Sequence, residues 1–301
     1  MEKPTLAAVI AQKYGKQPVK IQRIGGGFYA DVYSVSFADG VPIVAKVYKT
    51  DNVMSAETEQ LALLRQYACV PMPEILWSYN ADSAFPSDVM AMNCLPGANG
   101  GSVFYINPRK RARLAEQVVN NLLCFHNTEN PNGFGEIGSK IYYNTFNDYY
   151  LAKAKSILTM ADELFQKQLL PETVYHTAQQ AVQSFNSVFY LPITKSALIH
   201  GDYNMWNILV DKKACTVTAC IDPFGCMWAD SELDLYQLNN ANGKHFRLLE
   251  TYAEKKPLSE NFPQKCAFYE LFTEIEHYYR SGHTVDKRKI TAVANALAKF
   301  L

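Results

Sequence analysis

The sequence has no long hydrophobic run, no excess of charge of either sign and no cysteine spacing typical of a metal site. No window approaches the roughly 18 apolar residues that identify a membrane-spanning helix, and the first ten residues lack the layout of a signal peptide. The 29 lysines and arginines equal the 29 aspartates and glutamates, so the net charge is zero. This balance indicates neither nucleic-acid nor membrane binding. We expect a cytoplasmic protein, and its oligomeric state stays open.

The seven cysteines are scattered and include no Cys-x-x-Cys pair. An odd, scattered set indicates neither a disulfide framework nor a structural zinc site. Cys69, Cys124 and Cys220 lie in apolar runs, so we expect them to be core thiols.

Hydrophobic periodicity divides the chain into a strand-rich part, a linker and a helical part. Residues 1–93 carry apolar runs of strand length and one helix at 55–67, residues 94–102 have the composition of a linker, and residues 103–301 are mainly helical. Strands are expected at 19–24, 31–37, 42–48, 75–79 and 87–92. Further helices are expected at 107–127, 146–168, 171–187, 231–239, 244–255, 261–280 and 286–300.

Three polar residues, His200, Asp202 and Asn207, stand between two apolar runs, 197–199 and 208–210, that are typical of buried strands. An ionised aspartate is costly to bury without a partner, so packing alone does not explain the pattern. A polar loop with an Asx turn is the alternative explanation. We expect His200 to orient the loop by a hydrogen bond rather than to act as a base.

A second apolar strand, 217–221, follows and ends in Asp222. The order His-x-Asp-x4-Asn, followed by a strand-borne Asp, matches the catalytic arrangement of phosphotransferases with a kinase fold. In that chemistry Asp202 accepts or orients the proton of a substrate hydroxyl. Asn207 and Asp222 then bind the Mg²⁺ ions that bridge the phosphates of ATP.

Gly25, Gly26 and Gly27 lie between two expected strands. Glycines let the backbone approach phosphate oxygens closely, and their amides can point at the anion. On its own this run is a weak signal, because a glycine-rich hairpin is more often only a turn. A strand follows it, so it matches neither the dinucleotide-binding nor the Walker pattern.

Lys46 is the lone charge in an otherwise apolar strand. It is either an edge-strand lysine that faces solvent or a buried cation that needs phosphate or carboxylate. Glu57 and Glu59 on the next helix are candidate partners, unless both lie in a solvated first turn. We favour Glu57, which precedes Leu61 by four residues and so shares its helix face.

Other acidic and histidine residues have structural alternatives. One of Asp230 and Asp234 is expected to cap a helix, and Asp234 alternatively buttresses the catalytic stretch. His126 is expected to be a core or capping residue. The acids of the helical stretch 269–280 form a solvated face, or some of its residues border a substrate cleft: Glu270, Glu274 and His277.

With these residues assembled, the chain resembles the aminoglycoside phosphotransferase family of kinase-like enzymes, which also includes choline, methylthioribose and fructosamine kinases. The resemblance rests on segments along nearly the whole chain: 24–33, 44–46, Glu57 with Leu61 and Leu64, 70–76, 123–126, 200–209 and 221–223. Asp222-Pro223 and the segment 228–230 are also partly similar to the fructosamine kinase subgroup. That subgroup usually has Leu-Trp-Ser-Gly where this chain has Tyr203-Asn-Met-Trp206, so the substrate stays open.

The resemblance implies a bilobal α+β fold of the protein-kinase type, with a small antiparallel-sheet lobe and a larger helical lobe. It implies ATP and Mg²⁺ as cofactors, with the adenine against the linker near Met92, Asn93 and Leu95. It also implies that the Lys46–Glu57 pair positions the phosphates.

The sequence therefore predicts an ATP- and Mg²⁺-dependent phosphotransferase acting on a free hydroxyl of a small molecule such as an amino sugar, ketoamine or aminoglycoside. A protein kinase is disfavoured because Asp222 is followed by Pro-Phe-Gly and no Ala-Pro-Glu segment follows. A pseudokinase or nucleotide-binding module is the alternative, and a scaffold protein is a third. Neither has a reason to keep Lys46, Asp202, Asn207 and Asp222 together.

Overall fold

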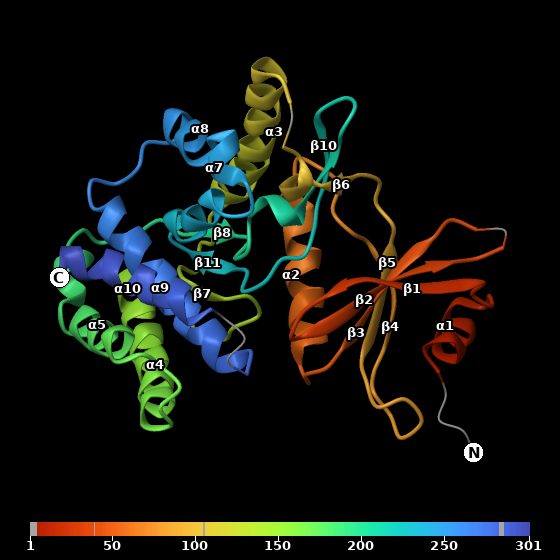
Figure 1. Cartoon of the computed structure of the whole chain (residues 1–301), viewed down its shortest axis with the longest axis horizontal. Helices are drawn as coiled ribbons and strands as arrows, with labels where there is room; N and C mark the ends of the chain where they lie inside the picture. The colour runs from red at the N-terminus through yellow and green to blue at the C-terminus, as the bar shows by residue number, and fades with distance from the viewer. Residues whose placement is uncertain (1–4, 39, 105, 283–285) are drawn as a thin grey trace.

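The computed structural model describes residues 5–38, 40–104, 106–282 and 286–301. Figure 1 shows a strand-rich N-terminal part, coloured red to orange, beside a larger helical part that carries the C-terminus. Helix α2 (Val53–Tyr67) lies where the two parts meet. The antiparallel N-terminal sheet and the helical C-terminal part agree with the fold class expected from the sequence.

The N-terminal part is built on an antiparallel sheet of five strands in the order β1-β2-β3-β5-β4. These strands are β1 (Lys20–Gly26), β2 (Ala30–Ser36), β3 (Ile43–Tyr48), β4 (Ile75–Tyr79) and β5 (Val89–Asn93). The five expected strands are confirmed, with shifts of one or two residues at some ends. Strand β3 lies at the centre of the sheet, so Lys46 is not an edge-strand residue.

Successive residues of a strand point to opposite faces of a sheet. Both faces of this sheet are apolar, and a helix covers each of them. Val89 and Ala91 of β5 belong to the core formed with α1 (Leu6–Tyr14). Met90 and Met92 belong to the core formed with α2. Helix α1 was not expected, because only two of its residues are buried and they give too short a periodic pattern.

The helical part contains two cores. One is formed mainly by α4, α5, α9 and α10, and the other runs from the sheet and α2 through α3 to the catalytic stretch. Of the helices described, none is long and apolar enough to cross a membrane. The longer helices are α3 (Pro108–His126), α4 (Phe146–Gln166), α5 (Glu172–Gln183), α8 (Leu248–Lys255), α9 (Phe262–Arg280) and α10 (Lys287–Leu297). The short ones are α6 (Phe185–Val188), α7 (Gly243–Phe246), η1 (Gly100–Ser102), η2 (Met205–Asn207), η3 (Ser231–Asn239) and η4 (Ala298–Phe300).

Two small sheets hold the polar stretch in place. One has the order β10-β9-β6 and the other β7-β11-β8. Their strands are β6 (Ala98–Asn99), β7 (Gly135–Glu136), β8 (Ala197–Ile199), β9 (Ile208–Asp211), β10 (Thr216–Cys220) and β11 (Met227–Ala229). The stretch runs from β8 through η2 to β9, and Asp222 follows β10, so paired strands fix the ends of both polar segments.

Three expected elements differ in the structure. The helix expected at 244–255 is interrupted at Arg247, whose φ of 56° is left-handed and separates α7 from α8. The helix expected at 171–187 divides at Ser184 into α5 and α6. The element at 231–239 is a 3-10 helix, and β6 lies within the expected linker at 94–102.

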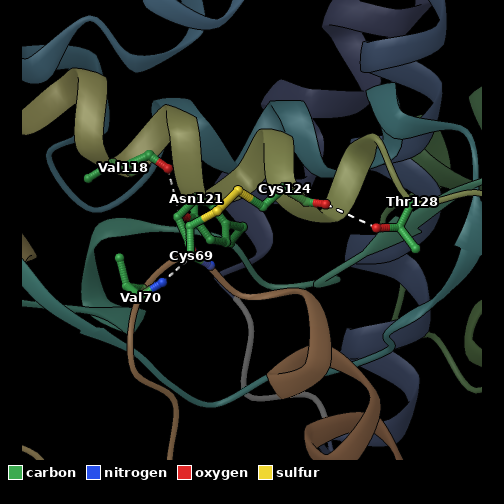
Figure 2. Close-up of a disulfide and its surroundings, with 7 residues drawn as sticks. Cys69, Val70, Val118, Asn121, Cys124 and Thr128 are labelled. Carbon is green, nitrogen blue, oxygen red and sulfur yellow. Dashed lines mark hydrogen bonds between the residues drawn. A yellow bond between two sulfur atoms is a disulfide. The ribbon is translucent and has the colours of Figure 1, made fainter.

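The expectation that Cys69 and Cys124 are core thiols is wrong: they form a disulfide, shown in Figure 2. Their Cα atoms lie 6.3 Å apart although 55 positions separate them in the chain. Asn121 of α3 fixes the approach, since its Oδ1 accepts hydrogen bonds from the amides of Cys69 (3.0 Å) and Val70 (3.2 Å). Cys220 is a buried free thiol, as expected.

Candidate active site

Asp202 lies in the loop between β8 and η2, where two asparagines hold its carboxylate. Asn204 Nδ2 donates to Oδ1 (2.7 Å) and Asn207 Nδ2 donates to Oδ2 (2.8 Å). Asn207 Nδ2 also donates to the Asp202 carbonyl (2.8 Å), so one amide fixes both the backbone and the side chain of the aspartate. The structure therefore brings Asp202 and Asn207 together as expected, and it adds Asn204.

The environment of Asp202 suits it to accept a proton near neutral pH. Burial raises the pKa of its carboxyl to about 7; hydrogen bonds from Asn207 and Asn204 oppose the rise, and the nearby carboxylate of Asp222 adds to it. A general base works best when its pKa is close to the working pH. The proton affinity of Asp202 therefore suits a general base, and its role as the base stays a prediction.

Asp234 supports the catalytic loop from inside the helical part, as one reading of the sequence expected. Its Oδ2 accepts from the amide of His200 (2.8 Å) and its Oδ1 from that of Gly201 (2.7 Å). Its Oδ2 also lies 3.2 Å from Nε2 of His126, whose Nδ1 lies 2.8 Å from the hydroxyl of Tyr252. His126 is therefore a hydrogen-bonded core histidine.

His200 itself is packed rather than catalytic. Its ring is completely buried, with ring centroids 5.4 Å from Tyr203 and 6.4 Å from Phe125. Burial lowers the pKa of its imidazole, so the ring is neutral at pH 7. Neither ring nitrogen of His200 has a hydrogen-bond partner among the described residues, so the expected hydrogen bond from this side chain is wrong. It is the backbone amide of His200, bonded to Asp234, that fixes the loop.

Removing the Asp234 carboxylate is expected to destabilise the protein by about 2–5 kcal/mol, because two loop amides and His126 lose their acceptor in a buried site. Urea unfolding of Asp234→Ala measures the change in free energy. Glu254→Ala, at an exposed position of α8, serves as the matched control. A loss for Asp234→Ala no larger than that of the control would show that water replaces the carboxylate.

Lys46 joins the two parts of the fold through two carboxylates. Its Nζ lies 2.5 Å from Oε1 of Glu57 and also forms an ion pair with Asp222. Burial alone would lower the pKa of this ammonium group, but Asp222 and Glu57 together raise it, so Lys46 stays charged. Glu57 also accepts from the hydroxyl of Tyr48 (2.8 Å).

The choice of Glu57 over Glu59 agrees with this geometry. Glu59 is exposed on α2 and has no ion pair among the described residues. Its Oε2 lies 2.7 Å from the point where a Cβ on Gly138 would sit, away from Lys46. The alternative that both glutamates are solvated is wrong for Glu57, which is 9% exposed.

Asp222 is held beside Asn207 by the backbone. The amide of Ile221 donates to the carbonyl of Asn207 (2.9 Å), and Asp222 has a left-handed φ of 59° that turns the chain after β10. The side chain of Asp222 is half exposed, and only its Oδ1 contacts Lys46. The other Asp222 oxygen and the Oδ1 of Asn207 accept no hydrogen bond from the described residues, so they fit the oxygen ligands that Mg²⁺ takes.

No group of three or more His, Cys, Asp or Glu side chains suited to a metal occurs in the described part of the chain. Such a cluster is not required for Mg²⁺, which usually takes only one or two protein ligands and completes its shell with phosphate and water. The role of Asn207 and Asp222 as Mg²⁺ ligands stays a prediction.

The glycine run forms a tight hairpin between β1 and β2. Gly26 has φ 134°, and a Cβ there would lie 2.7 Å from Oδ1 of Asp31. The amide of Gly27 donates to the carbonyl of Ala30 (2.8 Å), and Lys49 Nζ donates to the Gly27 carbonyl (3.0 Å). A substitution at Gly26 would therefore disturb the hairpin, while contact of Gly25, Gly26 and Gly27 with phosphate stays a prediction.

The residues expected near adenine lie at the end of the sheet. Met92 is buried against the core shared with α2, and Leu95 is half-buried. Asn93 is tied to the segment before β4, because its Oδ1 accepts from the amide of Glu74 (2.7 Å) and its amide donates to the Glu74 carbonyl (3.0 Å). Their contact with a nucleotide also stays a prediction.

A cavity of about 430 Å³ opens beside the catalytic loop, and its lining includes Glu57, Gly201 and His277. His277 lines this cavity, whereas Glu270 and Glu274 do not. That the cavity binds a substrate stays a prediction. Glu274 is not on a solvated face either, because it is 7% exposed and lies 2.5 Å from Lys289 Nζ.

Asp230, Glu232 and Lys265 form a second buried cluster of charged side chains. Asp230 caps η3, where it accepts from the amide of Glu232 (3.1 Å), as one reading of the sequence expected. Asp230 and Glu232 both lie 2.7 Å from Nζ of Lys265, and Asp230 also accepts from the hydroxyl of Tyr269 (2.7 Å). Lys265 is missed by sequence reasoning because a lysine in α9 gives no sign of burial.

Comparison with solved structures confirms the kinase-like fold. A putative fructosamine-3-kinase from Thermobifida fusca superposes with a TM-score of 0.69 at 19% identity, covering 98% of this chain and 99% of the other. A thermostable mutant of an aminoglycoside phosphotransferase, in complex with ADP and hygromycin B, gives a TM-score of 0.74 at 16% identity and covers 99% of both chains. A macrolide 2'-phosphotransferase type I gives 0.65 at 16% identity, over 100% of this chain and 99% of the other.

Sequence comparison reaches the same family. The uncharacterized protein YcbJ of Escherichia coli K12 is 21% identical over 278 residues, which cover 87% of this chain and 86% of that protein. The model of the phosphotransferase enzyme family matches residues 20–254, a span that includes Lys46, Asp202, Asn207 and Asp222. The chain therefore belongs to the phosphotransferase enzyme family.

Proposed function

We propose that this protein transfers the γ-phosphate of ATP to a hydroxyl of a small molecule in a Mg²⁺-dependent reaction. The observation that carries the proposal is the Asp202 carboxylate, buried, fixed by Asn204 and Asn207, and with a pKa near 7. It lies next to Asp222 and the Lys46–Glu57 pair, so a base and a charged phosphate site meet at one place.

The residues divide the chemistry between them. Asp202 accepts the proton of the acceptor hydroxyl as its oxygen forms a bond to the γ-phosphorus and the bond from that phosphorus to the β–γ bridging oxygen breaks, leaving ADP. Lys46 lies where it can neutralise phosphate charge, and Glu57 holds it there. Such catalysis is mainly positioning and electrostatic stabilisation.

Cofactor binding is part of the proposal. Asn207 and Asp222 would hold Mg²⁺, whose chemistry is to bridge the phosphates and neutralise their charge. Gly25, Gly26 and Gly27 would contact the phosphates, and Met92, Asn93 and Leu95 would border the adenine. The nucleotide lobe would then be residues 1–93, the linker 94–102 and the acceptor lobe 103–301.

The cytoplasm maintains ATP, so we propose that the enzyme works there. Disulfides are uncommon in that reducing compartment. Because Cys69 is exposed, the bridge between Cys69 and Cys124 is accessible to reductants. Two observations support an enzyme over the pseudokinase alternative: the Lys46–Glu57 ion pair and the hydrogen bond that Asn207 donates to the Asp202 carboxylate.

ADP formation across a panel of acceptors tests the function. The panel contains amino sugars, ketoamines, aminoglycosides, choline and thio-sugars, each assayed with Mg²⁺–ATP and with Mg²⁺ removed by EDTA. We expect acceptor-dependent ADP release from at least one class, lost with EDTA. Absence of turnover together with absence of Mg²⁺–ATP binding would favour a module without phosphotransferase activity.

A further inference from the structure

The cavity beside the catalytic loop is taken as the candidate acceptor site. It is lined by Gly201, the neighbour of Asp202 in the chain, but not by Asp202, Asn207 or Asp222 themselves. Glu57, Gly201 and Pro223 mark the end of its lining nearest the catalytic residues, and α4 and α9 supply much of the remainder. Gly25, Gly26, Gly27 and the residues expected near adenine do not line it. Its volume of about 430 Å³ is in the range of small-molecule sites. The charged side chains that line it therefore indicate which charges the acceptor carries.

One wall carries a net positive cluster. Glu276 Oε1 lies 2.9 Å from Arg280 Nη2, and its Oε2 lies 3.3 Å from Lys153 Nζ, so one carboxylate is shared by two cations. The side chains of Lys153 and Glu276 are 22% and 20% exposed. Solvent screens these two half-buried charges less than surface charges, whereas the Arg280 side chain is 51% exposed. The surplus positive charge of the cluster can attract an anion.

The glycine hairpin covers this cluster. Tyr29 lines the cavity, and its ring lies 4.9 Å from that of Phe224. The Tyr29 hydroxyl is buried without a hydrogen-bond partner in the described part of the chain, within electrostatic range of Arg280 and Glu276. Phe28 approaches within 3.8 Å of the Cβ position of Gly282, just past the end of α9. An unpaired buried hydroxyl beside the cations provides a further polar contact for a ligand.

The acids at the side of the cavity formed by α2 and β7 have the opposite charge. Asp51, Glu59 and Glu136 line the cavity there, and no ion pair involves them among the described residues. The remaining lining is largely apolar and aromatic, and includes Tyr150 and Ile157. The pocket thus has a cationic end, an anionic side and an apolar floor.

We propose that the phosphoryl acceptor is a hydroxylated zwitterion. Its anionic group, such as a carboxylate, binds Lys153 and Arg280, and its ammonium group faces Glu59 and Glu136. This inference rests on the proposed function. A purely cationic acceptor would leave the surplus positive charge of Lys153 and Arg280, which share Glu276, unmatched. A purely anionic acceptor would meet the acids that have no ion pair.

Ion-exchange behaviour identifies the charge class without knowing the compound. A metabolite extract from the cells that make the protein is fractionated on ion exchangers. Each fraction is assayed for transfer of labelled phosphate from ATP by the wild-type protein. Asp202→Ala is the control, and only transfer that this variant does not support is counted. A zwitterionic acceptor passes both exchangers near neutral pH. The cation exchanger retains it at about pH 2, where its carboxylate is protonated, and the anion exchanger at about pH 11, where its amine is neutral.

Other charge classes behave differently and would overturn the inference. A polycation stays on the cation exchanger at neutral pH, a simple anion stays on the anion exchanger, and a neutral sugar passes at every pH. Any of these outcomes leaves the phosphotransferase function standing. If no fraction supports transfer and Mg²⁺–ATP does not bind, both the function and the inference fail.

Two variants test whether the cationic end of the pocket binds the acceptor. Lys153→Met and Arg280→Met should each raise the acceptor KM by about tenfold or more, since hydrogen bonds to charged groups are lost, while the KM for ATP stays within about twofold. Lys155→Met, exposed on the same helix and outside the cavity, is the matched control. An unchanged acceptor KM, or a raised KM for ATP, would assign the cluster to another role.

Discussion

Asp202→Asn is expected to lower turnover about 10²–10⁴-fold, the contribution typical of a general base. Asparagine has nearly the same shape, so packing around the loop is kept, but its amide cannot accept the hydroxyl proton. The measurement is kcat at saturating ATP and acceptor. Mg²⁺–ATP affinity should change little, because the metal ligands assigned here are Asn207 and Asp222.

The control for this variant is Asp211→Asn, which changes an aspartate in an exposed turn after β9. It should keep normal turnover. If Asp202→Asn also keeps wild-type turnover on the identified acceptor, Asp202 is not the base, and the function must be reassigned.

The pH profile tests the same group in the unchanged protein. Because the pKa of Asp202 is raised to about 7, its carboxyl is protonated and inactive below that pH. Log kcat should therefore rise with unit slope up to about pH 7 and then level off. Nucleotide affinity is measured at each pH, so that protonation of ATP is separated from protonation of Asp202. A profile that is flat from pH 5 to pH 8 would contradict this assignment.

Asp222→Asn is expected to weaken Mg²⁺–ATP binding by about 100-fold or more. Losing an outer partner of a metal ligand already costs about 10–100-fold in metal affinity, and Asp222 is itself the anionic ligand of the proposed Mg²⁺ site. Its removal also leaves the Lys46 ammonium group with Glu57 as its remaining carboxylate partner. Calorimetric titration of ATP with and without Mg²⁺ measures the effect.

The internal control is binding in EDTA. Wild type and Asp222→Asn should bind metal-free ATP with similar, weak affinity, because the difference between them depends on the metal. An equal Mg²⁺-dependent gain in both proteins would remove Asp222 from the site.

The sequence predicted those parts of the site whose residues are close in the chain or carry an isolated charge. Asp202 and Asn207 are five positions apart between two apolar strands, so their neighbourhood is a local property. Lys46 was recognisable because a charge in a central apolar strand needs a partner. Helical spacing then favoured Glu57 over Glu59 as that partner.

The missed features depend on contacts between distant segments. Cys69 and Cys124 approach only because the connection after α2 packs on α3, and no spacing rule indicates this. Lys265 is buried because Asp230 and Glu232, more than 30 positions earlier, close around it. Local periodicity carries no information on such pairings, so α9 was predicted correctly while its ionic contacts were not.

The bridge between Cys69 and Cys124 has a consequence for how the cleft can move. When the disulfide is formed, the sheet and the helical part are joined covalently twice, once through the segment after β5 and once through the bridge. Two bodies held at two points keep one easy motion, a rotation about the line that joins those points. Opening of the cleft is thereby restricted to a hinge rotation of one part relative to the other about that line. Phe28 and Tyr29 of the glycine hairpin contact the segment just past α9 and the ring of Phe224, so opening of the cleft would separate these contacts.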